Sequence, residues 1–128
     1  MKTELRKINI DNTKYIYSID NKYQIGKETN ILTIKVYLYG HKNTPLVIEF
    51  LTMDHYSMGQ VLISGINLNN TITNTLDRVN INEPKHIRNF ILQGMQNGWI
   101  GNNKLPVQNG IDYLNELGYE TDIIEPLT

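Results

Sequence analysis

The sequence predicts an α+β fold, in which an antiparallel sheet of four to five strands is followed by two helices packed on one of its faces. Apolar and polar residues alternate with a period of two in the first half. Turn-forming residues separate these segments, and apolar residues recur at helical spacing in the last third. The 128 residues fit a single domain. Its predicted parts are a β-meander (1–52), an irregular stretch with short strands (53–82), and two helices plus a short edge strand (83–128).

The N-terminal meander is expected to contain four antiparallel strands. The segments RKINI and KYIYSI flank the turn DNT, whose Asp and Asn tolerate left-handed backbone geometry. Residues 32–38 and 46–50 alternate most regularly, and the polar turn GHKNTP separates them. The sheet should therefore have one apolar face and a second face that carries Tyr, Thr and Lys.

The middle of the chain is less regular. We predict a loop at MDHYSMG and a fifth strand at QVLISGINL, which Gly65 interrupts. The stretch NNTITNTLD is rich in turn-forming residues, and RVNI is predicted as a short strand that leads into the first helix.

The C-terminal part is predicted to be helical. The first helix begins at Pro84, whose missing N–H needs no partner in a first turn, and Asn82 or Glu83 is its expected N-cap. The second helix runs from about Pro106 to Leu117, and YETDII then adds the edge strand. The apolar stripes are Ile87, Phe90, Ile91 and Met95 in the first helix, and Val107, Ile111, Leu114 and Leu117 in the second.

Both predicted helices end with a glycine followed by an aromatic residue. Gly98–Trp99 and Gly118–Tyr119 fit the ending in which a left-handed glycine stops the helix and the next residue folds back over its last turn. Beneath Trp99 lies Gly94, so we expect the indole to lie against the helix backbone there. We interpret Gly98–Trp99, which holds the only tryptophan, as a helix stop with an aromatic lid.

Composition narrows the range of functions. The chain has no cysteine, which excludes disulfides, cysteine nucleophiles and thiolate metal sites. Its net charge of -1 gives poor support for nucleic-acid binding. Without a signal-peptide pattern or a bilayer-length apolar run, we expect a cytoplasmic protein with no membrane association. Alanine is absent while Asn, Ile, Lys and Tyr are abundant, which indicates AT-rich coding DNA and a bacterial or phage origin.

The sequence contains no catalytic motif, and it predicts neither a cofactor nor a metal. His41, His55 and His86 lack the spacing of metal ligands and are expected at the surface. An enzyme would need a deep pocket in which Glu49, Asp54 and His55 converge.

The tyrosine-rich face of the sheet is the main candidate for function. Tyr and Trp supply a large, rigid contact area at low entropic cost, although AT-rich coding also raises the number of tyrosines without selection for binding. The candidate partner-binding residues are Tyr17, Lys35, Tyr37 and Tyr39. In the alternative, the loops GWIGNNK and DHYSMGQ form the rim of a ligand pocket, with His55, Arg88, Trp99 and Lys104 as its binding residues.

The segment NEPKHIRNFILQGMQNGW resembles a stretch of small uncharacterised bacterial and phage α+β proteins, which include immunity proteins of toxin systems. The shared pattern consists of Pro84, Ile87–Arg88, Ile91, Gly94 and Gly98–Trp99. The resemblance is confined to Pro84–Trp99, and those relatives often place a proline after the tryptophan, where this chain has Ile100. It implies a small cytosolic α+β protein and transfers no catalytic residue.

Together these features predict a non-enzymatic protein-binding module, an immunity or inhibitor protein that occludes a partner such as a toxin or a defence component. The alternative is a sponge-like phage or bacterial accessory protein that binds a small ligand or a nucleotide. Both hypotheses leave the identity of the partner and the oligomeric state open, and both are compatible with a homo-oligomer.

Overall fold

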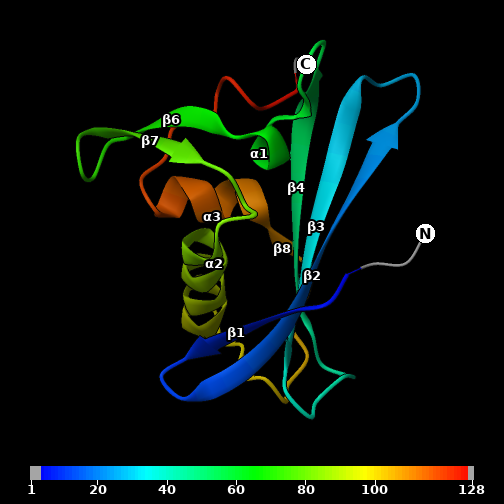
Figure 1. The fold of residues 1–128 in the computed structure, drawn as a ribbon, viewed down its shortest axis with the longest axis vertical. Coiled ribbons are helices and arrows are strands. Elements are labelled where there is room, and N and C mark those ends of the chain that lie inside the picture. Colours follow the sequence, from blue (N-terminus) through cyan, green and yellow to red (C-terminus); the bar gives the residue numbers. More distant parts are fainter. Residues whose placement is uncertain (1–3, 127–128) are drawn as a thin grey trace.

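The computed structural model describes residues 4–126, which form an α+β fold of eight strands and three helices (Figure 1). The strands are β1 (Arg6–Ile10), β2 (Thr13–Gln24), β3 (Thr29–Leu38), β4 (Leu46–His55), β5 (Gly59–Gln60), β6 (Ile66–Asn70), β7 (Thr75–Val79) and β8 (Gln108–Asn109). The helices are α1 (Val61–Ser64), α2 (Pro84–Gln96) and α3 (Gly110–Glu116). The predicted fold class is confirmed, but the main sheet is larger than expected and there is one more helix.

The N-terminal meander forms as predicted. Strands β1 to β4 pair antiparallel in chain order, and the turn between β1 and β2 uses Asp11 and Asn12 at φ +48° and +67°. Positive φ at both central residues is the geometry of the tight hairpin turns that match strand twist. At the far side of β4, β5 pairs antiparallel and β8 pairs parallel, which completes a six-stranded sheet.

All three helices lie on one face of this sheet, and the opposite face carries no other element among residues 4–126 (Figure 1). The covered face supplies the core, because every second residue of β3 and β4 points into it. Its fully buried members are Leu32, Ile34, Val36, Leu46, Ile48 and Phe50. They meet the predicted stripe of α2, of which Ile87, Phe90 and Ile91 are buried and Met95 packs at the margin.

The segment after β4 differs from the predicted fifth strand. Only Gly59 and Gln60 pair with β4, because the Gln60 side chain then accepts a hydrogen bond from the Leu62 N–H at 3.1 Å and starts the single turn of α1. Gly65, at φ +94°, ends this turn and lets the chain reverse into β6. The end of the predicted fifth strand continues into β6, which pairs with β7 in a separate two-stranded hairpin, and β7 combines the end of the predicted turn-rich stretch with the start of the predicted short strand RVNI.

The second C-terminal helix begins at Gly110 rather than near Pro106. Gln108 and Asn109 extend to pair with β4, and the Asn109 side chain accepts a hydrogen bond from the Ile111 N–H at 2.9 Å, which makes Asn109 the N-cap. Val107, which was expected in the helical stripe, consequently lies outside the helix and is 57% exposed.

The C-terminal stretch YETDII does not form the predicted edge strand. Tyr119 makes one isolated bridge to Asn70, and the chain then turns back toward β4. Ile124 is buried, and its carbonyl accepts a hydrogen bond from the Met53 N–H at 2.8 Å. Because Thr121 is also buried in this turn, the segment closes the end of the core instead of widening the sheet.

Both helix endings have the predicted form. In α2 the Gly98 N–H donates to the Met95 carbonyl and the Trp99 N–H donates to the Gly94 carbonyl, at 3.1 and 2.9 Å. In α3 the Gly118 N–H donates to the Asn115 carbonyl and the Tyr119 N–H donates to the Leu114 carbonyl, at 3.0 and 2.9 Å, with Gly118 at φ +102°. These paired bonds define the Schellman ending, so the glycine–aromatic pairs are helix stops.

The absence of a side chain at Gly94 has another reason than the one expected. A Cβ on Gly94 would overlap the Leu46 side chain, so this glycine makes room for β4. The fully buried Trp99 ring lies 5.9 Å from the Tyr15 ring, centroid to centroid, and its Nε1–H donates to the Thr44 carbonyl at 3.1 Å. The indole therefore joins the end of α2 to the start of β4.

His86 is buried, which corrects the expectation that all three histidines lie at the surface. Within residues 4–126 its Nε2 atom has no hydrogen-bond partner. Burial lowers the pKa of His86 below its ordinary value of 6.5, and the charge of Lys85 lowers this pKa further. The side chain is therefore neutral in the folded protein at pH 7.

We predict that Gly94→Ala lowers the free energy of unfolding. Overpacking against Leu46 costs about 1–3 kcal/mol, which outweighs the gain of up to about 1 kcal/mol from the higher helix propensity of alanine. Urea unfolding of the variant measures the difference. Asn89→Ala, at an exposed position of the same helix, is the control and should be close to neutral. The double variant Leu46→Val/Gly94→Ala should lose less unfolding free energy than the sum of the losses in the two single variants, because the smaller valine leaves room for the added methyl group. Fully additive losses would contradict a direct contact between the two residues.

We also predict that His86 makes the folded protein less stable as the pH is lowered below 6.5. Since the folded state holds this imidazole neutral, the unfolded chain takes up its proton first as the pH drops through 6.5. The contribution of His86 to the free energy of unfolding should therefore be constant well above pH 6.5 and decrease below it, toward the lowered pKa of the folded state. Urea titrations of the wild type and of His86→Phe at a series of pH values test this. An equal pH slope in the two proteins would show that His86 is not responsible.

Candidate functional site

The uncovered side of the main sheet, here called the outer face, is built from alternate residues of β2, β3 and β4. The strand register sets neighbouring residues in rows, which are Ile16–Tyr37, Lys35–Val47, Thr33–Glu49 and Ile31–Leu51. Apolar side chains thus lie toward the two ends of the strands, and the charged side chains of Lys35 and Glu49 lie between them. An antiparallel sheet commonly leaves such a face to solvent, but here apolar groups remain on it.

One end of the outer face is an apolar hollow with a volume of about 610 Å³. We call it the tyrosine hollow, and it is lined by Leu5, Ile16, Tyr37, Leu38, Tyr39, Gly40 and Lys42. The Tyr39 side chain is 60% exposed, and Lys14 Nζ lies 4.5 Å from the centre of its ring. A cation over an aromatic face at this distance is attractive, so Lys14 helps to hold the ring in place.

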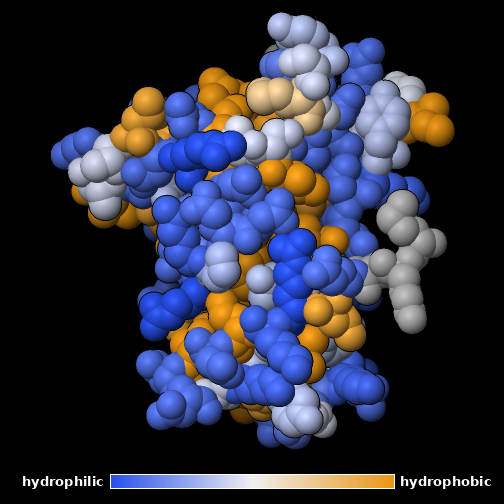
Figure 2. Space-filling view, in the orientation of Figure 1, coloured by the Kyte–Doolittle hydropathy of each residue, from blue (hydrophilic) through white to orange (hydrophobic). Residues whose placement is uncertain are grey.

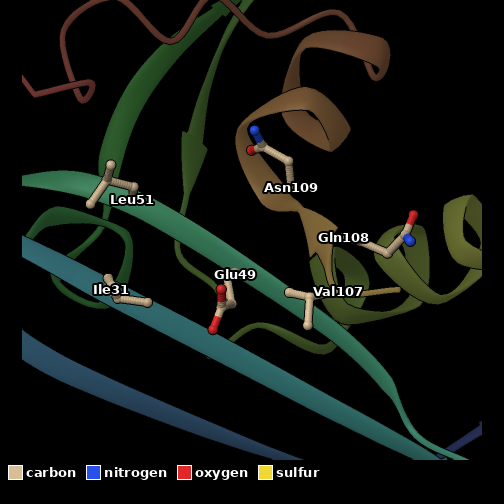
Figure 3. A pocket seen from close by; sticks show the side chains of 6 residues that line it. All are labelled: Ile31, Glu49, Leu51, Val107, Gln108 and Asn109. Atoms are coloured by element: carbon tan, nitrogen blue, oxygen red, sulfur yellow. The ribbon is translucent and has the colours of Figure 1, made fainter. Parts of the chain in front are cut away.

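The other end of the outer face is a groove of about 440 Å³ beside β4. This Glu49 groove is lined by Ile31, Glu49, Leu51, Val107, Gln108 and Asn109 (Figure 3). Figure 3 shows that Ile31, Glu49 and Leu51 come from two neighbouring strands, whereas the other three come from the segment that enters α3. The Gln108 side chain is held by the Tyr113 hydroxyl, which donates to its Oε1 at 3.0 Å. The β8 pairing thus builds one wall of the groove.

The two ends of the outer face differ in charge. Lys14 and Lys42 surround the tyrosine hollow, and Lys35 lies in the next row along the sheet. The Glu49 groove has a carboxylate as its only ionisable lining group. The linings of the two cavities therefore differ in charge, although Lys22 of β2 also stands on the outer face, opposite Ile31.

The predicted partner-binding residues divide between the two faces. Tyr37, Tyr39 and Lys35 lie on the outer face, as expected, and the two tyrosines line the same hollow. Tyr17 does not join them, because it is 3% exposed and belongs to the core. In the register of β2 against β3, Tyr17 stands opposite Val36 and therefore lies on the same face as that buried valine.

Sequence reasoning also missed residues of the outer face. Ile16, Leu51 and Val107 contribute apolar surface to it but were not selected. The register pairs Ile16 with Tyr37 and Leu51 with Ile31, so knowledge of the strand pairing would have placed both residues on the outer face. Val107 could not be found in this way, since its position depends on the pairing of β8 with a strand far away in the sequence.

Several tyrosines serve the interior and are not available for binding. Burial raises the pKa of Tyr15, Tyr113 and Tyr119, so these hydroxyls stay neutral at physiological pH. The abundance of tyrosine is thus partly a property of the core, whereas Tyr37 and Tyr39 line a cavity of the outer face and remain candidates for contact with a partner.

The residues proposed for a ligand pocket do not come together. Trp99 is fully buried, and the loop that follows it is tied to the start of β4 by the Thr44 hydroxyl, which donates to the Gly101 carbonyl at 2.8 Å. His55 is the last residue of β4, about 30 Å away along an extended strand. Its ring stacks on Tyr56 at 4.6 Å, centroid to centroid. The two loops therefore lie at opposite ends of the sheet, and Arg88 and Lys104 are exposed side chains with no common pocket among the described cavities.

The residues of the enzyme hypothesis also lie apart. Glu49 is on the outer face, whereas the Asp54 carboxylate turns to the covered side and accepts a hydrogen bond from the Asn30 side-chain amide at 2.7 Å. Residues 4–126 contain no group of three His, Asp or Glu side chains that could hold a metal ion. In the same range, no helix has the length and apolar character needed to cross a membrane.

We predict that Trp99→Ala lowers the free energy of unfolding by about 3–5 kcal/mol, since removal of a fully buried indole leaves a large cavity and an unpaired carbonyl at Thr44. Chemical denaturation measures the loss. Tyr39→Ala, at an exposed aromatic position, should change stability by less than about 1 kcal/mol. A stable Trp99→Ala protein would show that the indole is not structural.

Comparisons with protein-family models, with curated proteins and with solved structures found no match for this chain. A function must therefore be inferred from the surface of the molecule itself. The outer face is the surface on which aromatic, aliphatic and charged side chains come together without a covering element.

Proposed function

We propose that this chain is a non-enzymatic protein-binding module that contacts its partner with the outer face. One observation carries the proposal: apolar and aromatic side chains line both ends of a sheet face that no described element covers. Exposed apolar surface of this kind is typical of interaction sites. A sheet also presents it on a rigid backbone, which reduces the entropy lost on binding.

The composition of the outer face fits a protein partner better than a nucleic acid. Tyr37 and Tyr39 provide the aromatic contact area that protein interfaces favour. A nucleic-acid surface would need a continuous basic surround, but Glu49 stands on the same face and the chain has a net charge of -1. The charges that line the two cavities instead fit a partner with an acidic group opposite Lys42 of the tyrosine hollow and a basic group opposite Glu49 of the groove.

We further propose that the module is a cytoplasmic immunity or inhibitor protein of bacterial or phage origin. Its partner would be a toxin or a defence component whose working surface it covers. Occlusion needs a preformed face and no chemistry in the chain itself. The resemblance of Pro84–Trp99 to immunity-type proteins supports this class, and the AT-rich coding bias supports the origin.

We predict that substitutions on the outer face abolish partner binding without unfolding the protein. The test is co-expression with the products of neighbouring genes, followed by affinity capture of the intact chain. Tyr39→Ala and Lys35→Glu should each reduce the amount of captured partner at least about tenfold, since aromatic and charged anchors dominate interface energetics.

Tyr56→Ala is the matched control, because Tyr56 is a 95% exposed tyrosine beyond the end of β4 and away from both cavities of the outer face. It should bind as the wild type does. If the chain captures no neighbouring gene product and rescues cells from none, the inhibitor proposal is wrong. If the control weakens binding and the two outer-face variants do not, the partner contacts another surface.

A further inference from the structure

The second half of β2 is an edge of the main sheet. Pairing with β1 stops at Tyr17, opposite Arg6, whereas pairing with β3 continues to Gln24. Among residues 4–126 no strand pairs with Ser18–Gln24 on the side away from β3, and Figure 1 shows this stretch along the outside of the sheet. We call Ser18–Gln24 the β2 edge.

The register shows which backbone groups of the β2 edge point outward. The Tyr39 N–H donates to the Lys14 carbonyl at 3.0 Å, so these two opposite residues are a hydrogen-bonded pair. Bonded and non-bonded pairs alternate along antiparallel strands, and the β2–β3 register continues without a bulge to Gln24. Even-numbered residues of β2 therefore bond to β3. The N–H and C=O groups of Ile19, Asn21 and Tyr23 point away from the sheet.

Side-chain hydrogen bonds hold this edge in an extended form. The Asn21 side-chain amide donates to Asn30 Oδ1 at 2.9 Å, and its own oxygen accepts a hydrogen bond from the Gln60 side-chain amide at 2.9 Å. Gln60 also donates to the buried Thr52 hydroxyl oxygen at 2.9 Å. The outward backbone groups are thus presented by a strand whose conformation is already fixed, which lowers the entropic cost of pairing.

We propose that the β2 edge pairs antiparallel with the β2 edge of a second copy of this chain, with the two-fold axis at Asn21. The outward groups belong to odd-numbered residues, so odd residues of one copy must stand opposite odd residues of the other. An axis at Asn21 sets Ile19 opposite Tyr23 of the second copy, Asn21 opposite Asn21, and Tyr23 opposite Ile19. No other two-fold axis within the β2 edge uses all three outward residues.

Charge selects the same register. With the axis at Asn21, Asp20 stands opposite Lys22 of the second copy, and the symmetry repeats this pair. An axis at Asp20 or at Lys22 would instead set like charges directly opposite each other, which is unfavourable. A lysine on an edge strand usually discourages pairing between molecules. Here each Lys22 meets a carboxylate in the one register that also satisfies the backbone.

Apolar side chains add to this contact. Tyr23 is 46% exposed although it lies in a paired strand, and in the proposed register it packs beside Ile19 of the second copy. Figure 2 shows hydrophobic atoms at the tip of the hairpin that joins β2 and β3, where Ile25 is exposed. Directly opposite residues lie on the same side of a sheet, so the outer faces of both copies would form one continuous surface. This pairing does not depend on the proposed inhibitor function.

The first test is the oligomeric state of the purified full chain, measured by sedimentation equilibrium over an about hundredfold range of concentration. The wild type should form dimers. Asp20→Lys and Lys22→Glu should each raise the dimer dissociation constant about tenfold, because each replaces two attractive pairs by two repulsive ones. An equimolar mixture of the two variants should form a heterodimer about as tightly as the wild type associates, since every mixed pair then joins opposite charges.

The second test concerns the backbone. Tyr23→Pro removes an outward N–H without breaking a bond to β3, and it should abolish the dimer, whereas Tyr23→Thr keeps the N–H and should largely retain it. Circular dichroism and thermal midpoints establish that each variant is folded. A wild type that stays monomeric at every concentration overturns the proposal. Dimers that form equally well in all these variants, or no preference for the heterodimer in the mixture, overturn it as well.

Discussion

The close approach of both long helices to β4 is the constraint on which the rest of the structure depends. Leu46 and Phe50 of β4 occupy the space that a side chain at Gly94 of α2 or at Gly110 of α3 would fill. Phe50 also packs against Phe90, with ring centroids 5.3 Å apart. Because glycine stands at both contacts, two helices can cover one face of the same strand. The helices are thereby all drawn to one side of the sheet, and the opposite side remains open.

The sequence predicts those parts of the fold that depend on local chemistry. Alternation and turn residues predict the meander, and the glycine–aromatic pairs predict both helix endings. The start of α3 was missed, because β8 pairs with Ile48 and Glu49, which lie far away in the sequence and compete successfully with the helical periodicity. In α1 the capping amide of Gln60 redirects a segment whose apolar pattern also fits a strand.

In the candidate site, too, local sequence patterns predict some features, whereas others depend on the pairing of strands. Tyr37 and Tyr39 were placed correctly because alternation within one strand suffices for them. Tyr17 was misplaced, since the face on which it lies follows from its register against β3. The β2 edge could not be seen at all in the sequence, because it results from the difference in length between two neighbouring strands: β1 has 5 residues and β2 has 12. Strand lengths and register are thus as informative about this surface as the residue types.

The short β8 pairing has a consequence for the order in which the molecule assembles and opens. Ile48 and Gln108 are separated by about 60 residues, so their pairing closes a long loop, whereas the hairpins of the meander close short ones. We expect the meander to form early and β8 to dock late, together with the N-cap that starts α3. Only two residue pairs hold β8 in place, which makes this segment a natural point of local unfolding. The Glu49 groove then has one wall that can move away while the tyrosine hollow keeps its shape, so the two ends of the outer face would adapt to a partner to different degrees.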